Sequence, residues 1–257
     1  LPDYMCYEYI PCDETLFKNV YKLPGAHCFE YKDGKLNIWR YYNIQYKTDE
    51  SKSLEEWEQL ITDEFTKSVE AHKISDVEVG CFLSSGVDSS YVVREVSKVT
   101  KDVKTFSVGY EEEKYSELPY AQDFSKTIGV QNISNKVSAD DYFRMASKIQ
   151  WYMDEPLPNP SEVPLYFLAE NAAKYVKVVL SGEGADELFG GYPMYLAGGH
   201  FAKYSRIPKF LRKGAAALAK RAPDFKGKHF IVRGAMGPYE RVMRANYVFT
   251  RDGRWQY

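Results

Sequence analysis

Apolar and polar residues alternate along this chain with two different periods, which predicts strands that alternate with helices. Positions 54–69 carry apolar residues at helical spacing, after a capping box formed by Ser53 and Glu56. The apolar run 77–83 has the length and composition of a buried strand, and a helical pattern follows at 90–98. Downstream we expect strands at 103–109, 133–137 and 176–180, and helices after Ser116, after Ser138 and at 162–174.

This order of elements predicts an α/β fold. Strands that alternate with helices form right-handed βαβ units, which pack into a parallel sheet with helices on both faces. In such sheets ligands bind beyond the carboxyl ends of the strands. We therefore look for chemistry in the residues that directly follow each strand, above all after the strand at 77–83 and after the strand at 176–180.

A short β-rich segment precedes the α/β part. Within residues 1–46, short aromatic and β-branched runs alternate with turn signals, and the run 7–10 ends at a proline. The pair Asp33-Gly34 is typical of a two-residue hairpin turn, here between strands expected at 27–31 and 36–39. The polar stretch 47–52 is interpreted as a linker to the rest of the chain.

Composition narrows the class of protein. The chain has 257 residues, of which 44% are hydrophobic and 27% charged, as in ordinary soluble globular proteins. No apolar run approaches the roughly 20 residues needed to span a bilayer, so we expect no membrane partner. The four cysteines form no CxxC pair, which favours a reducing compartment and therefore the cytoplasm. The chain opens on Leu1 rather than methionine, and we expect a fragment of a longer protein.

The charge distribution argues against a nucleic-acid partner. The formal net charge is −2 at pH 7, which is unlike a general nucleic-acid binder. Residues 203–233 hold ten Lys and Arg and one acid, Asp224, and a basic run of this kind can contact RNA. The same stretch has the pattern of an ordinary amphipathic helix with a solvated basic face. We therefore expect no nucleic-acid binding.

The loop that follows the strand at 77–83 has the residue types of an anion site. It carries four serines, whose hydroxyls can donate to phosphate oxygens, and Gly86, which lets the backbone approach a ligand. A strand, such a loop and a helix N-terminus together point N–H groups at an anion. Asp88 would repel a phosphate unless Mg²⁺ lies between them. Without the Gly-Lys-Ser/Thr ending this is no Walker loop, and taken alone it is equally well a Ser/Gly turn with a helix cap.

Two stretches together resemble a known family. The loop Ser84-Ser85-Gly86-Val87-Asp88-Ser89-Ser90 resembles the SGGxDSS pyrophosphate loop of the N-type ATP pyrophosphatases. The stretch 180–192, LSGEGADELFGGY, is similar to the second ATP-site motif of glutamine-hydrolysing asparagine synthetases, and the two stretches match that family in order and separation. Ser85 replaces the commoner first glycine of the loop, and Ala185 stands where serine is also used.

The resemblance implies a fold and a division into domains. The α/β part is expected to be of the adenine nucleotide α-hydrolase-like class. Residues 1–46 would form the end of a glutaminase domain, and residues 47–257 part of the synthetase domain. The family's catalytic cysteine lies at the start of the glutaminase domain, so none of the four cysteines here is given that role. A segment at 239–249 is similar to a helix a little beyond the family's ATP site.

The resemblance also implies a reaction. MgATP would adenylate the side-chain carboxylate of aspartate to β-aspartyl-AMP. Ammonia, released from glutamine in the intact enzyme, would then give asparagine and AMP. The expected cofactors are ATP and Mg²⁺, and the expected partners are these small molecules, with a homodimer allowed for the intact enzyme.

Site residues follow position by position from the same resemblance. Glu183, Asp88 and Asp186 are expected to be catalytic, and the two aspartates to bind Mg²⁺. The residues expected to bind ATP are Leu83, Ser84, Ser85, Gly86, Asp88, Ser89, Ser90, Val108, Ser181 and Gly182. For Glu183 and Glu187 the ordinary alternative is a favourable charge at a helix N-terminus.

Other hypotheses stay open at this point. A related amidotransferase or lactam synthetase would adenylate a different carboxylate, and a nucleotide-binding fragment would bind ATP without turnover. A tRNA-modifying ligase is a more distant alternative. The loop 154–160, with two carboxylates, an amide and three prolines, is a candidate for contacts on the substrate side.

Overall fold

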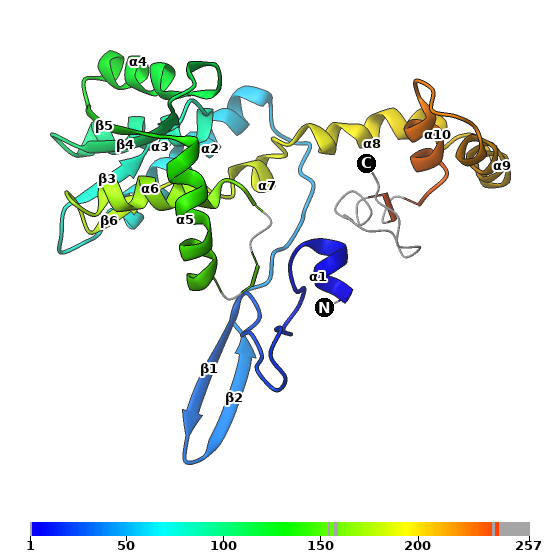
Figure 1. Ribbon diagram of the computed structural model, residues 1–257, viewed down its shortest axis with the longest axis horizontal. Helices are drawn as coiled ribbons and strands as arrows, with labels where there is room; N and C mark the ends of the chain where they lie inside the picture. Colours follow the sequence, from blue (N-terminus) through cyan, green and yellow to red (C-terminus); the bar gives the residue numbers. More distant parts are fainter. Residues whose placement is uncertain (1, 154, 157–158, 238–239, 242–257) are drawn as a thin grey trace. The chain divides into compact units, whose positions relative to one another are not determined.

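The structure is a computed structural model that describes residues 2–153, 155–156, 159–237 and 240–241 (Figure 1). Most of the segment expected to be helical at 239–249, and part of the 154–160 loop, lie outside these residues. The chain divides into two compact units, one of residues 12–183 and one of residues 1–11 with 184–257. Each unit is described by itself, and the predicted domain boundary after residue 46 stays a prediction.

The unit of residues 12–183 is built on a four-stranded parallel sheet, which confirms the predicted α/β fold. The strands lie in the order β5-β4-β3-β6. Their bounds are Val79–Phe82 for β3, Lys104–Tyr110 for β4, Gln131–Val137 for β5 and Val178–Leu180 for β6. The chain runs outward from β3 to β5 and returns to β6 on the other side of β3. This reversal makes the carboxyl ends of β3 and β6 the expected ligand crevice of the sheet.

Helices cover both faces of this sheet (Figure 1). On one face α3 and α4 contact the strands, and α2 packs on α3; on the other face α6 contacts the strands and α5 packs on α6. Their bounds are Leu54–His72 for α2, Val87–Val99 for α3, Leu118–Ile128 for α4, Ala139–Tyr152 for α5 and Glu162–Ala172 for α6. Cys81 is fully buried in the core under α3, as expected from the apolar run in which it lies. Burial raises the pKa of its thiol to about 12.

Several helix ends lie where their capping residues predict them. Ser53 and Glu56 form the predicted capping box of α2, and Ser138 accepts a hydrogen bond from the backbone N–H of Asp141 at the start of α5. Gly129 ends α4 in the left-handed conformation, with φ of 75°.

Two predicted helix starts are wrong. α3 begins at Val87 and not at Ser90, because Gly86 serves as its N-cap, so half of the expected loop is the first turn of the helix. α4 has Glu117 at its N-cap position, whereas Ser116 ends the short 3₁₀ helix Glu113–Tyr115.

The β-rich segment is confirmed in part. β1 (His27–Lys32) and β2 (Lys35–Arg40) pair antiparallel as predicted. Asp33 and Gly34 both have positive φ, 49° and 75°, as a hairpin turn of this length requires. The run 7–10 forms no strand: residues 2–7 are the helix α1, and residues 8–10 belong to no helix or strand. A lone strand there would leave its backbone groups unpaired, whereas a helical turn satisfies them locally, as in the bond from the Glu8 N–H to the Tyr4 carbonyl.

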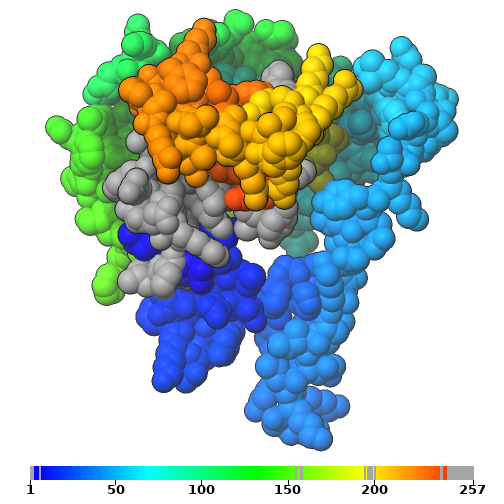
Figure 2. Space-filling model, turned by 90° about the vertical axis from the view of Figure 1, so that its right-hand side faces the viewer, coloured from blue at the N-terminus to red at the C-terminus, as the bar shows by residue number. Residues whose placement is uncertain are grey.

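The other unit is helical in the residues that the structure describes. It contains α7 (Ala185–Phe189), α8 (Pro193–Tyr204), α9 (Lys209–Arg221) and α10 (Lys228–Gly234). α9 and α10 pack together and are coloured orange in Figures 1 and 2, and Arg212 joins them through a hydrogen bond to the Gly234 carbonyl. α9 buries Ala216 and Ala219 and exposes most of its basic residues, which confirms the predicted amphipathic helix. Within the described ranges, no helix is long and apolar enough to cross a membrane.

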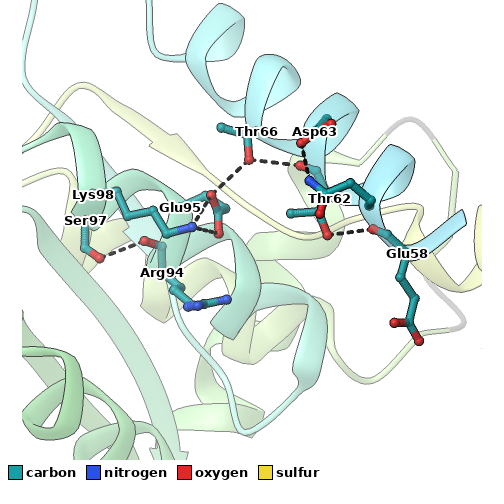
Figure 3. A network of polar contacts seen from close by, with 9 residues as sticks. Glu58, Thr62, Asp63, Thr66, Arg94, Glu95, Ser97 and Lys98 are labelled. Carbon is teal, nitrogen blue, oxygen red and sulfur yellow. Dashed lines mark hydrogen bonds and ion pairs between the residues drawn. The ribbon is translucent and has the colours of Figure 1, made fainter. Parts of the chain in front are cut away.

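A buried carboxylate connects α2 to α3 (Figure 3). Glu95 is only 2% exposed, and both of its oxygens accept hydrogen bonds from Lys98 Nζ, at 2.6 and 2.8 Å. The hydroxyl of Thr66 on α2 donates to Glu95 Oε2 at 3.0 Å. Lys98 itself is about half exposed, so the two members of the ion pair differ sharply in their access to water.

This difference predicts an asymmetry in stability. Lys98→Met should lower the free energy of unfolding by about 3 kcal/mol, because it leaves the Glu95 carboxylate buried without its cation. Glu95→Gln should cost only about 1 kcal/mol, because Lys98 can turn to water and the amide still accepts from Thr66. Urea unfolding of both variants and of the double mutant tests this. Equal losses in the two single mutants would contradict it, and the double mutant should be more stable than Lys98→Met alone.

Candidate functional site

A pocket lies at the carboxyl ends of β3, β4 and β6, as the fold predicts. Its empty space measures about 600 Å³, a figure that includes space open to solvent. Its lining consists of Phe82, Leu83, Ser84, Ser89, Ser107, Val108, Glu117, Leu118, Ala121, Leu165, Leu168, Ser181, Gly182 and Glu183. All of these residues belong to the unit of residues 12–183.

The loop after β3 is closed by its own hydroxyl groups. The Ser84 N–H donates to Ser89 Oγ at 3.1 Å, and the two serine hydroxyls are 2.8 Å apart. The Gly86 N–H donates to Ser84 Oγ, also at 3.1 Å. These bonds fix the loop against the first turn of α3 and place both hydroxyls at the wall of the pocket. Such hydroxyls can donate to a phosphate oxygen once they exchange their present partners.

The second motif rests directly on the first. A Cβ atom at Gly182 would lie 2.9 Å from the Asp88 carbonyl carbon and 2.9 Å from the Ser89 nitrogen. Both are backbone atoms and cannot rotate away, so only glycine fits between β6 and the start of α3. The two motifs lie almost a hundred residues apart in the sequence, and the parallel pairing of β3 with β6 brings them together.

A buried polar group supports the floor of the pocket. Ser107 Oγ donates to the Leu83 carbonyl at 2.6 Å and accepts from Asn132 Nδ2 at 2.9 Å. The Leu83 N–H in turn donates to the Phe106 carbonyl at 2.8 Å. Leu83 is thereby fixed through both backbone groups at the point where β3 ends.

Seven of the predicted site residues line the pocket, namely Leu83, Ser84, Ser89, Val108, Ser181, Gly182 and Glu183. The predicted residues Ser85, Gly86, Asp88 and Ser90 lie in the same loop and helical turn but are not part of the lining. The Ser90 N–H already donates to the Gly86 carbonyl within α3. Asp88 is half-buried next to Gly182.

Asp186 belongs to the other compact unit, at the start of α7. Its carboxylate lies against Gly191, where any side chain would overlap it. Gly190 ends α7 in the left-handed conformation, with φ of 69°. The neighbouring Glu187 accepts a hydrogen bond from the Tyr192 hydroxyl, which raises the pKa of Tyr192 to about 12. That Asp88 and Asp186 hold one Mg²⁺ together stays a prediction.

Half of the pocket lining was not predicted from the sequence. Leu165 and Leu168 come from one side of α6, and Leu118 and Ala121 from α4. Ser107 lies within β4, where its hydroxyl is hidden in an otherwise apolar run. Glu117 was the residue that could have been found, because it follows the carboxyl end of β4 by a few residues. Its Oε2 accepts a hydrogen bond from the Ser85 N–H at 3.3 Å.

The chain is similar to known proteins over its whole length. A family model described as asparagine synthase matches residues 60–245. "Asparagine synthetase [glutamine-hydrolyzing] 1" of Bacillus subtilis is 37% identical over 261 aligned positions, which cover 100% of this chain and 41% of the relative. "Asparagine synthetase [glutamine-hydrolyzing] 3" of the same organism is 28% identical over 195 positions, covering 70% of this chain and 32% of the relative.

Among solved structures, the NH3-dependent NAD synthetase from Campylobacter jejuni matches with a TM-score of 0.38 and 17% identity, over 52% of this chain and 60% of that one. The chain spans about two fifths of the length of the first Bacillus relative. The family model covers well over half of the present sequence and includes both motifs at the pocket. The resemblance seen in these two motifs is thereby confirmed, and the chain belongs to the asparagine synthase family.

Proposed function

We propose that this chain carries the ATP-binding part of an asparagine synthetase-like ligase, which adenylates the side-chain carboxylate of aspartate and transfers the acyl group to ammonia. One observation carries the proposal: Gly182 of the second motif packs on the backbone of Asp88 and Ser89, at a pocket lined by both motifs. Membership of the asparagine synthase family supports the same conclusion.

The pocket has the chemistry that ATP requires. Leu118, Leu165 and Leu168 give it an apolar wall suited to adenine, and Leu83 and Val108 also line the pocket. The hydroxyls of Ser84 and Ser89 suit a phosphate group, and Ser181 and Gly182 suit the α-phosphate or the ribose. The absence of a side chain at Gly182 lets the end of β6 lie directly against the start of α3, which brings the two motifs together at the pocket.

The proposed reaction needs positioning and charge neutralisation more than proton transfer. A carboxylate oxygen of aspartate bonds to the α-phosphorus, and the bond from that phosphorus to the pyrophosphate oxygen breaks. Ammonia then attacks the acyl carbon, AMP leaves, and the nitrogen loses a proton. Glu183 lines the pocket and is proposed to act in forming the acyl-adenylate. The serine hydroxyls and loop N–H groups stabilise the negative charge that develops on the phosphates.

Mg²⁺ fits this site as a metal that arrives with the nucleotide. In the described part of the chain, no three His, Cys, Asp or Glu side chains gather into a metal site of their own. Mg²⁺ usually takes only one or two carboxylates besides phosphate oxygens and water. We propose Asp88 and Asp186 as these ligands. Bound there, the metal would neutralise phosphate charge.

The hairpin supports the proposed division at residue 46. One face of β1 and β2 carries Phe29 opposite Ile38 and Tyr31 opposite Leu36, and each of the four side chains is at least half exposed. A two-stranded hairpin with an exposed apolar face is not stable by itself. We propose that residues 1–46 complete a glutaminase domain that covers this face, and that residues 47–257 belong to the synthetase domain of a cytoplasmic, homodimeric enzyme.

ATP–pyrophosphate exchange tests the proposed function. We expect this 257-residue chain, with Mg²⁺ and labelled pyrophosphate, to form labelled ATP when aspartate is present and not with asparagine, which lacks the side-chain carboxylate. Exchange with another carboxylate would instead identify a related amidotransferase or lactam synthetase. MgATP binding without exchange would identify a module that binds the nucleotide without turnover. Absence of both exchange and MgATP binding would overturn the proposal.

A further inference from the structure

The pocket holds one carboxylate to which the proposed reaction gives no role. Glu117 occupies the N-cap position of α4, but its side chain makes no capping hydrogen bond to that helix. It extends instead to the Ser85 N–H, which lies 32 residues earlier in the chain and 3.3 Å from Glu117 Oε2. Burial raises the pKa of the Tyr110 hydroxyl, and Tyr142 and Glu117 raise it further, so the carboxylate acts on this end of β4 as well.

The Ser85 N–H occupies the centre of the proposed phosphate loop. On either side of it, the N–H groups of Ser84 and Gly86 are bound by hydroxyls of the loop and of α3. The Ser85 N–H is the one of these three whose acceptor comes from a different part of the fold. A carboxylate oxygen is also the protein group most similar to a phosphate oxygen in charge and in its hydrogen bonds to N–H donors.

The Ser85 N–H group cannot donate a full hydrogen bond to two anions at once. A phosphate that takes the Ser85 N–H must displace the Glu117 carboxylate, and it then lies close to a like charge. We infer that Glu117 is a competing anion of the phosphate loop: it holds the Ser85 N–H when no phosphate is bound, and it lowers the affinity of the pocket for nucleotide and for pyrophosphate. This rests on the proposed function, in which pyrophosphate must leave the loop after each adenylation.

If Glu117 had a different role, its removal would change the nucleotide affinity in the opposite direction. A carboxylate that accepted a hydrogen bond from ribose, or that helped to hold Mg²⁺, would strengthen nucleotide binding, and its removal would weaken it. The side chain is exposed at the rim of the pocket, so water and salt screen its charge. The competing effect should therefore be about threefold to fivefold in affinity, which is typical of a single exposed charge.

Calorimetric binding of inorganic pyrophosphate, MgATP and adenosine tests this inference on the full chain. Glu117→Gln should tighten the binding of pyrophosphate and MgATP by about threefold to fivefold, and the gain should shrink as the salt concentration rises. Adenosine has no phosphate, and its affinity should not change. Glu112→Gln is the matched control, because Glu112 is exposed, changes the net charge equally and is not part of the pocket lining. It should leave all three affinities unchanged.

Several results would overturn the inference. Weaker or equal pyrophosphate binding in Glu117→Gln would do so, and so would an equal gain in Glu112→Gln. Glu117→Asp keeps the charge on a shorter side chain and should bind pyrophosphate with an affinity between those of the unmodified chain and Glu117→Gln; an affinity above that of Glu117→Gln would exclude competition by charge. Failure of the unmodified chain to bind MgATP or adenosine would overturn the proposed function and this inference together.

Discussion

Gly182→Ala is expected to weaken MgATP binding by at least about tenfold, a loss of about 1.4 kcal/mol. The reason is steric. The added methyl group would lie 2.9 Å from two backbone atoms at the start of α3, and neither can move without moving the helix. The phosphate loop would shift with α3, because Ser84 and Ser89 are hydrogen-bonded to each other across its base. Fluorescence or calorimetric titration with MgATP measures the effect.

Gly214→Ala is the matched control for this change. Gly214 lies within α9, and a Cβ atom there would meet nothing within 4 Å. Alanine should therefore leave MgATP binding unchanged and stabilise the helix slightly, by up to about 1 kcal/mol. Thermal unfolding of both variants separates a local shift of the loop from general loss of structure. Full MgATP affinity in a folded Gly182→Ala variant would show that the contact between the two motifs does not shape the site.

The fold could be predicted because its signals are local and repeated. Apolar runs such as 77–83 and helical periods such as 54–69 fix the type of element, and their alternation fixes a parallel sheet. Caps were predicted correctly where the capping side chain and its partner are three residues apart, as in Ser53 with Glu56.

Ser116 shows why some helix ends could not be predicted. As a residue type it is a good N-cap, but its hydroxyl packs against Gly109, where a Cβ atom would overlap it, and has no hydrogen-bond partner among the described residues. Tertiary packing thus removes it from the capping position. At Gly86 the difficulty was different, since the Gly/Ser pattern fits a loop as well as the first turn of a helix.

Part of the site could be predicted from the sequence, and part could not. Residues directly after β3 and β6 were predicted because a strand end and a short motif mark them in the sequence. The residues from α4 and α6 were not, because Leu118, Leu165 and Leu168 differ from core leucines only in which neighbour they meet. Their role depends on where each helix packs on the sheet, and no local pattern carries that information.

Asp88→Asn is expected to lower the rate of aspartate-dependent ATP–pyrophosphate exchange by about 100-fold, because it removes a proposed ligand of Mg²⁺ next to the phosphates. The amide has the same size as the carboxylate, so packing against Gly182 is kept. Loss of exchange alone would also follow from a misplaced loop. The decisive measurement is therefore the sign of the effect on ATP binding with and without the metal.

With Mg²⁺ present, Asp88→Asn should weaken ATP binding, because a carboxylate and a phosphate that share a divalent cation attract each other through it. With Mg²⁺ removed by a chelator, the same change should tighten ATP binding, because only repulsion between two negative charges remains. Asp76→Asn, an exposed residue that is not part of the pocket lining, removes the same charge and should show neither effect. If Asp88→Asn weakened binding equally in both conditions, Asp88 would be a structural residue and the metal would have to be held elsewhere.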